Sequence, residues 1–121
     1  MNSLLWVLQA ALVLILVPAA ITRAVAYDFA KSRMAWVAAV PRPLLVFISC
    51  AEILGAVGLV LPGLTGVAPQ LTSAAAVGLA VIQALAFGFH VSRHEPRNAS
   101  ANVGLLALLV AVALGRSVFS P

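Results

Sequence analysis

The stretch ILGAVGLVLPGLTGVAPQLTSAAAVGLAVIQALAFGFHVS, residues 53–92, contains no charged side chain. A helix that crosses a bilayer needs about 20 apolar residues, so this stretch is too long for one span. Its middle, PGLTGVAP at residues 62–69, is rich in glycine and proline, which favour turns. The stretch therefore predicts a tight helical hairpin that crosses a membrane twice.

Two more apolar stretches flank this hairpin. Residues 4–22 precede it and residues 99–115 follow it, each without a charged side chain. No basic residue precedes the first stretch, and it exceeds the length typical of a signal peptide, so we expect a retained helix. We predict an all-α fold, an integral membrane four-helix antiparallel bundle. Its single transmembrane domain covers residues 1–121, with helices at about 4–26, 43–61, 70–92 and 99–117.

The composition supports a membrane protein. Hydrophobic residues make up 64% of the chain and charged residues 8%, against about 25% charged in soluble domains. Ten charged side chains are too few to coat a soluble enzyme, and the hydrophobicity excludes a disordered binder. The net charge of +4 has no basic, aromatic-rich stretch around it, so we expect no nucleic-acid partner.

The positive charges predict the orientation. The connections after the first and third predicted helices hold six of the seven basic residues, which are Arg23, Lys31, Arg33, Arg42, Arg93 and Arg97. The other side holds only Arg116. By the positive-inside rule, we expect both termini outside and the basic connections in the cytoplasm, in the plasma membrane or bacterial inner membrane.

Small residues recur at helical spacing and favour close packing of the helices. We expect Gly55 and Gly88 to lie in such contacts, so that leucine at either position should lower stability. The series are Ala76, Ala80, Ala84 and Gly88; Ala107, Ala111 and Gly115; and Ala51, Gly55 and Gly58.

Glu52 is the strongest candidate for a functional residue. It lies about 14 Å along its predicted helix, close to the bilayer midplane, where acids are costly and default to a functional role. Gln83 lies at a similar depth on an antiparallel helix, so we expect it to be the hydrogen-bond partner of a protonated Glu52. Arg23 or His90 could instead stabilise the ionised form. A structural role for Glu52, locking the helices together, stays open.

The other polar candidates lie near the cytoplasmic edge. We predict a ligand pocket with Glu52 and Gln83 at its floor and with Arg23, His90 and Asn102 at its rim. Interfacial contacts of His90, snorkelling of Arg23 and a helix-to-helix hydrogen bond of Asn102 are the structural alternatives. His90 and His94 have the spacing of two metal ligands on one helix face, but a third ligand is missing, so we expect no metal site.

Cys50 is the only cysteine, which excludes a thiol–disulfide relay within the chain. No phosphate-binding loop or haem-attachment motif is present, so no cofactor is evident, and a quinone or a lipid is the open candidate.

The chain resembles the DoxX-like family. The resemblance rests on PLLVFISCAEILGAVGLVLP at residues 43–62, LTGVAPQLT at 64–72, Phe89-His90, Asn102-x-x-Leu105 and Gly115-Arg116. It implies a four-helix membrane protein, with Glu52, His90, Asn102 and Arg116 at family positions. Some relatives are linked to thiosulfate–quinone oxidoreduction or oxidative-stress complexes. The first helix departs from the family, which often has Gly-x-x-Lys where this chain has Ile21-Thr22-Arg23-Ala24.

Three function classes follow. The first is a protein that binds a small lipophilic molecule, lipid or quinone, around Glu52, as a homo-oligomer or as an accessory subunit of a redox or envelope complex. The second is a membrane enzyme that uses Glu52 and His90 for proton transfer on a lipophilic substrate. The third is a proton-coupled small exporter. Such exporters carry their glutamate in the first helix, so the position of Glu52 argues against this class.

Overall fold

The computed structural model describes residues 2–68 and 70–118. Within them the chain folds into α1 (Asn2–Val25), α2 (Tyr27–Arg33), the 3-10 helix η1 (Ala35–Ala39), α3 (Arg42–Thr65), α4 (Leu71–Ser92) and α5 (Pro96–Val118). Of these described elements, α1, α3, α4 and α5 are long and apolar enough to cross a membrane. The predicted all-α membrane bundle is confirmed.

Two helix ends differ from the prediction, and both differences follow from proline and glycine. α3 continues through Pro62, whose ring is buried, and ends only where Gly66 adopts a left-handed conformation with φ +73°. The backbone amide of Gly66 donates to the Pro62 carbonyl, and this hydrogen bond closes the last turn of α3. The helix therefore ends later, and the turn begins later, than the predicted turn over residues 62–69. α5 begins at Pro96, because proline suits the first turn of a helix.

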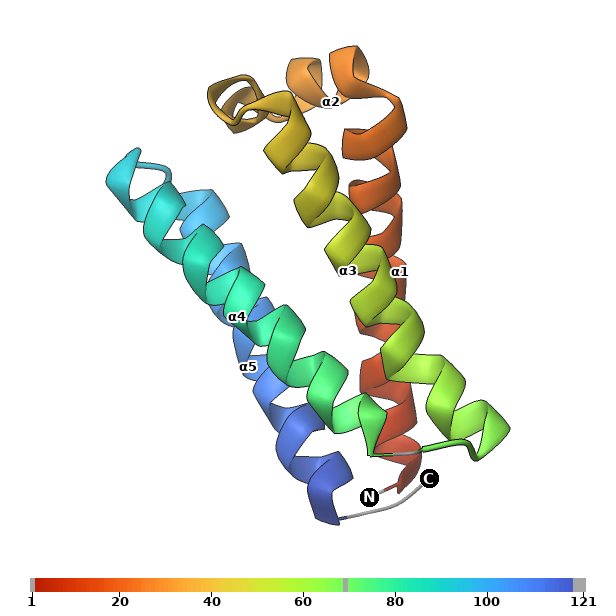
Figure 1. Ribbon diagram of the computed structural model, residues 1–121. Helices are drawn as coiled ribbons and strands as arrows, with labels where there is room; N and C mark the ends of the chain where they lie inside the picture. The colour runs from red at the N-terminus through yellow and green to blue at the C-terminus, as the bar shows by residue number, and fades with distance from the viewer. Residues whose placement is uncertain (1, 69, 119–121) are drawn as a thin grey trace.

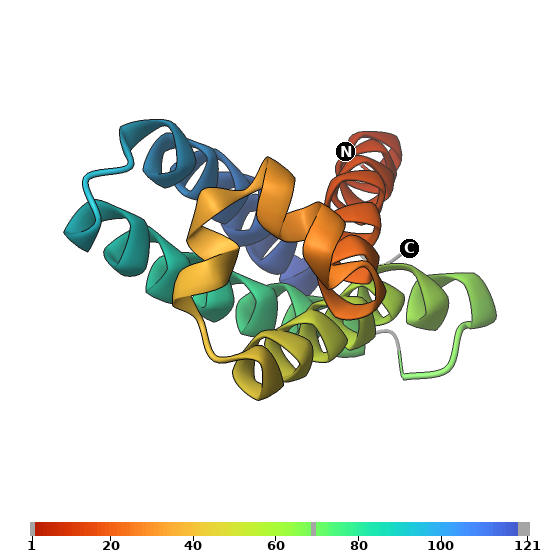
Figure 2. The same cartoon turned by 90° about the horizontal axis from the view of Figure 1, so that it is seen from above.

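The short elements α2 and η1 are absent from the sequence prediction, which treats residues 27–39 as part of a connection. They lie across one end of the bundle, over the space between the long helices (Figure 2). A small core of Ala30, Val37 and Leu45 holds them against the start of α3. Each is too short to give a clear periodic pattern, so the sequence carried little signal for either.

The four long helices form two pairs, α1 with α3 and α4 with α5 (Figure 1). The pairs meet where the α3–α4 turn, the start of α1 and the end of α5 lie together, which we call the hairpin end. They diverge towards α2, η1 and the α4–α5 connection, which we call the α2 end (Figure 1). The backbones of the two pairs therefore lie close together at the hairpin end and farther apart at the α2 end.

Glycines permit the close packing near the hairpin end. A Cβ on Gly58 would lie 2.7 Å from the Cβ of Ala75, and one on Gly55 would lie 2.7 Å from the side chain of Leu79. A Cβ on Gly115 would lie 2.6 Å from Leu5. These contacts join α3 to α4 and α5 to α1, so they fix both junctions between the pairs.

The expectation for Gly88 is wrong. A Cβ there would meet nothing within 4 Å, and Gly88 is exposed, as is Ala84 one turn before it. A helix turns by about 100° per residue, so positions spaced by four drift around its surface by about 40° at each step. The series that begins at buried Ala76 therefore leaves the interface before it reaches Gly88.

Candidate ligand-binding cavity

A cavity of about 320 Å³ opens where the two helix pairs diverge, beneath η1. The main core, which includes Leu16, Leu59 and Leu109, lies on the hairpin side, and the small core under α2 and η1 lies on the other. The walls of the cavity are mainly apolar. The side chains that line it include all five predicted pocket residues, which are Arg23, Glu52, Gln83, His90 and Asn102.

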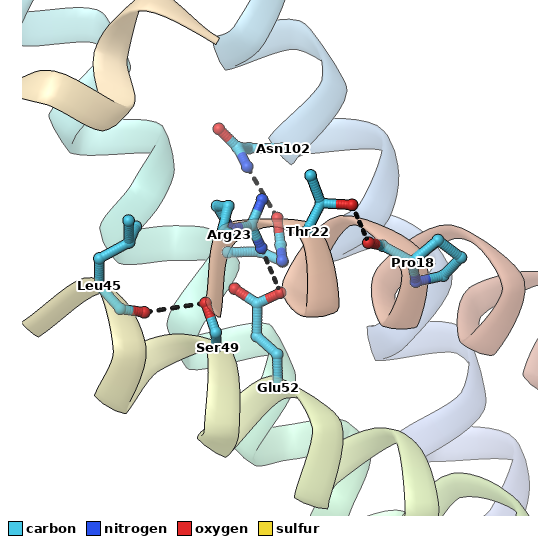
Figure 3. A network of polar contacts seen from close by, with 8 residues as sticks. Pro18, Thr22, Arg23, Leu45, Ser49, Glu52 and Asn102 are labelled. Carbon is cyan, nitrogen blue, oxygen red and sulfur yellow. Dashed lines mark hydrogen bonds and ion pairs between the residues drawn. The ribbon is translucent and has the colours of Figure 1, made fainter. Parts of the chain in front are cut away.

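Glu52 forms an ion pair with Arg23. The Arg23 Nη2 atom donates to Glu52 Oε2 over 2.9 Å, and the two residues are 8% and 5% exposed (Figure 3). Arg23 stands in the last turn of α1 and Glu52 in the middle of α3, so the long arginine side chain reaches inwards rather than to the membrane surface. Opposite charges attract strongly at low dielectric, which explains why the Arg23 guanidinium pairs with the Glu52 carboxylate.

Gln83 is not the partner of Glu52, so that expectation is wrong. Its Oε1 atom accepts a hydrogen bond of 2.7 Å from Nδ2 of Asn102, which joins α4 to α5. Asn102 thus makes the helix-to-helix contact that was the structural alternative, and it also lines the cavity. The polar floor consists of two cross-helix pairs, one in each half of the bundle.

His90 lies at the α2 end of the cavity, and aromatic rings surround it. Its ring stands edge-on to Trp36, with ring centres 5.2 Å apart, and to Phe89 at 5.3 Å. The guanidinium of Arg23 lies 5.5 Å from the centre of the Trp36 ring. Trp36 therefore lines the cavity and contacts two of its polar residues, His90 and Arg23.

The Nδ1 atom of His90 lies 2.8 Å from Oε1 of Glu95, just beyond the end of α4. The pKa of the Glu95 carboxyl is lowered below its ordinary value. The hydrogen bond with His90 is the largest cause, and the hydrogen bond from Nε of Arg93, over 3.2 Å, adds to it. His94 falls past the last turn with φ +57°, so it does not continue the helix face of His90. The spacing of the two histidines is therefore not that of two ligands on one helix.

A second polar cluster lies at the hairpin end, away from the cavity. The Nε atom of Arg116 donates to Oε1 of Gln9 over 2.7 Å, and its Nη1 atom donates to Oδ1 of Asn2 over 2.7 Å. Gln9 in turn donates to the carbonyl of Leu59. Sequence reasoning missed Gln9, although a lone amide within the apolar residues 4–22 was a usable signal.

The family model described as the DoxX-like family matches residues 7–112, which is most of the chain. No curated protein and no solved structure matches the chain.

Proposed function

Because this chain belongs to the DoxX-like family and encloses a cavity with apolar walls and a polar floor, we propose that it binds a small lipophilic molecule, a lipid or a quinone, between its helices. The apolar part of the ligand contacts the walls, and its polar part meets Glu52 and Gln83.

The single observation that carries this proposal is the cavity beside the buried polar groups. Protein interiors are packed without voids much larger than a water molecule, which takes up about 30 Å³ in the liquid. The cavity of about 320 Å³ is roughly ten times larger and approaches the size of small-ligand pockets. Ion pairs that serve only to lock helices together need no such space beside them.

The geometry favours binding over proton transfer between Glu52 and His90. Each side chain lines the cavity, but their partners differ, Arg23 for Glu52 and Glu95 for His90. Among the described residues, no hydrogen bond joins the two. The membrane enzyme is therefore the second candidate.

Filling the cavity should remove a bound lipophile. We expect organic extracts of the purified wild-type protein, analysed by mass spectrometry, to contain a lipophile in near-stoichiometric amount. Ala86 lines the cavity, so Ala86→Phe should reduce this amount at least fivefold.

The matched control is Ala84→Phe, on the same helix but exposed and outside the cavity, which should retain the wild-type amount. Equal loss in both variants, or no enriched lipophile in any sample beyond the bulk lipid, would contradict the proposal.

We propose that the α2 end faces the cytoplasm of the plasma or bacterial inner membrane, because it carries six of the seven basic residues. A phosphatase reporter that works only outside the cytoplasm should be active when fused after Pro121. The same reporter inserted at His94, in the α4–α5 connection, should be inactive. The reverse pattern of activities would refute this orientation.

A further inference from the structure

The floor of the cavity holds hydrogen-bonding capacity that the protein itself does not use. Glu52 is engaged through Oε2, and among the described residues its Oε1 atom has no hydrogen-bond partner. Gln83 is engaged through Oε1, and its Nε2 amide likewise has no partner within the described part of the chain. Both residues are at least 95% buried and line the cavity. The same cavity is therefore lined by an unused acceptor on α3 and an unused donor on α4.

The charges that face this floor balance. Arg23 from α1 and Glu52 from α3 neutralise each other as an ion pair. α4 contributes His90, whose Nδ1 atom faces Glu95, while the residues of α5 and η1 that line the cavity carry no formal charge. A phosphate or carboxylate head group would add an uncompensated charge at low dielectric, which is costly. A neutral head group adds none.

A quinone fits this floor less well than a hydroxyl group. Its two carbonyl oxygens only accept hydrogen bonds, so they could engage Gln83 but would leave Oε1 of Glu52 without a donor. A hydroxyl donates and accepts through one oxygen atom, so it can satisfy both. Leaving a buried charged acceptor unpaired weakens binding by tenfold or more.

The walls leave room for an apolar tail to reach the bilayer. Leu85 and Leu44 line the cavity and are 71% and 48% exposed, so the space between α3 and α4 opens to the side at this level. The cavity need only hold the head group and the first part of the chain.

We propose, on the premise of the binding function above, that the ligand is a neutral lipophile with a hydroxyl head group, an alcohol or a phenol. Its oxygen donates to Oε1 of Glu52 and accepts from Nε2 of Gln83, and its tail extends between α3 and α4 into the lipid.

Three probes with a six-membered carbon ring and the same decyl tail separate the head groups: 4-decylphenol, decyl-1,4-benzoquinone and 4-decylbenzoate. At about pH 8 the phenol is neutral and the benzoate is ionised. We would measure binding of radiolabelled decylphenol to the protein in lipid nanodiscs, subtract empty nanodiscs, and displace it with the other two probes. We expect the phenol to bind at least tenfold more tightly than either competitor.

A charge variant should invert this preference. Glu52→Gln leaves Arg23 uncompensated, so the benzoate should bind at least tenfold more tightly relative to the phenol than it does in the wild-type protein. The double variant Arg23→Gln/Glu52→Gln is neutral again and should restore the preference for the phenol. The wild-type ranking decides the proposal if Glu52→Gln does not fold.

The outcomes separate the two levels of the argument. Wild-type binding of the benzoate or the quinone as tight as that of the phenol overturns the hydroxyl ligand and leaves a lipophile-binding protein. No saturable binding of any probe, with no co-purified lipophile removed by Ala86→Phe, overturns the proposed function itself.

Discussion

Glu52→Leu is expected to lower the free energy of unfolding by about 3–5 kcal/mol, the usual cost of removing one partner of a buried ion pair. The variant leaves the guanidinium of Arg23 buried at 8% exposure with no carboxylate to neutralise it. Arg23 also lies against Trp36, so the loss should spread to η1. Reversible unfolding in mixed micelles, followed by circular dichroism, measures the change.

The control removes both charges. Replacing a whole buried ion pair by apolar residues is often neutral or stabilising, so Arg23→Leu/Glu52→Leu should recover most of the loss. A double variant as unstable as Glu52→Leu would show that the leucine at position 52, rather than the orphaned charge, causes the damage.

Gly58→Leu should destabilise the protein by about 1–3 kcal/mol or more, the range for overpacking a well-filled interface. The added side chain would meet the Cβ of Ala75, which is fixed to the backbone of α4, so it cannot swing aside. α3 and α4 would have to separate at the hairpin end, where the two helix pairs meet. Thermal unfolding in the same micelles reports the effect.

Gly78→Leu and Gly88→Leu are the matched controls, because a Cβ at either position meets nothing within 4 Å. Both variants should unfold within a few degrees of the wild-type protein. If Gly58→Leu behaves as they do, the close approach of α3 and α4 is not needed for stability.

The sequence was sufficient for the membrane helices because hydropathy and length alone decide such spans. It was insufficient for the helix ends and for α2 and η1, which depend on local geometry. The sequence pattern predicts that Pro62 begins a turn, yet α3 continues past it with the Pro62 ring buried. η1 also has contacts with residues distant in the chain, those of Trp36 with Phe89 and His90, which no local pattern encodes.

Depth counting along the helices placed Glu52, Gln83, His90, Asn102 and Arg23 in one region, and all five line the cavity. Whether they bind a ligand stays a prediction. The pairing within the set was wrong because depth counting uses backbone positions, whereas an arginine side chain spans more than one helical turn. Arg23 therefore reaches Glu52 from the rim, and Gln83 forms its hydrogen bond with Asn102 instead.

The divergence of the helix pairs gives the protein a wedge shape in the bilayer (Figure 1). It occupies a larger cross-sectional area in the leaflet at the α2 end than in the other leaflet. Lateral pressure in that leaflet therefore acts on the spacing between the pairs, because bringing them together releases area to the lipids. Tighter packing of the acyl chains in that leaflet would therefore favour a smaller distance between the two helix pairs at the α2 end.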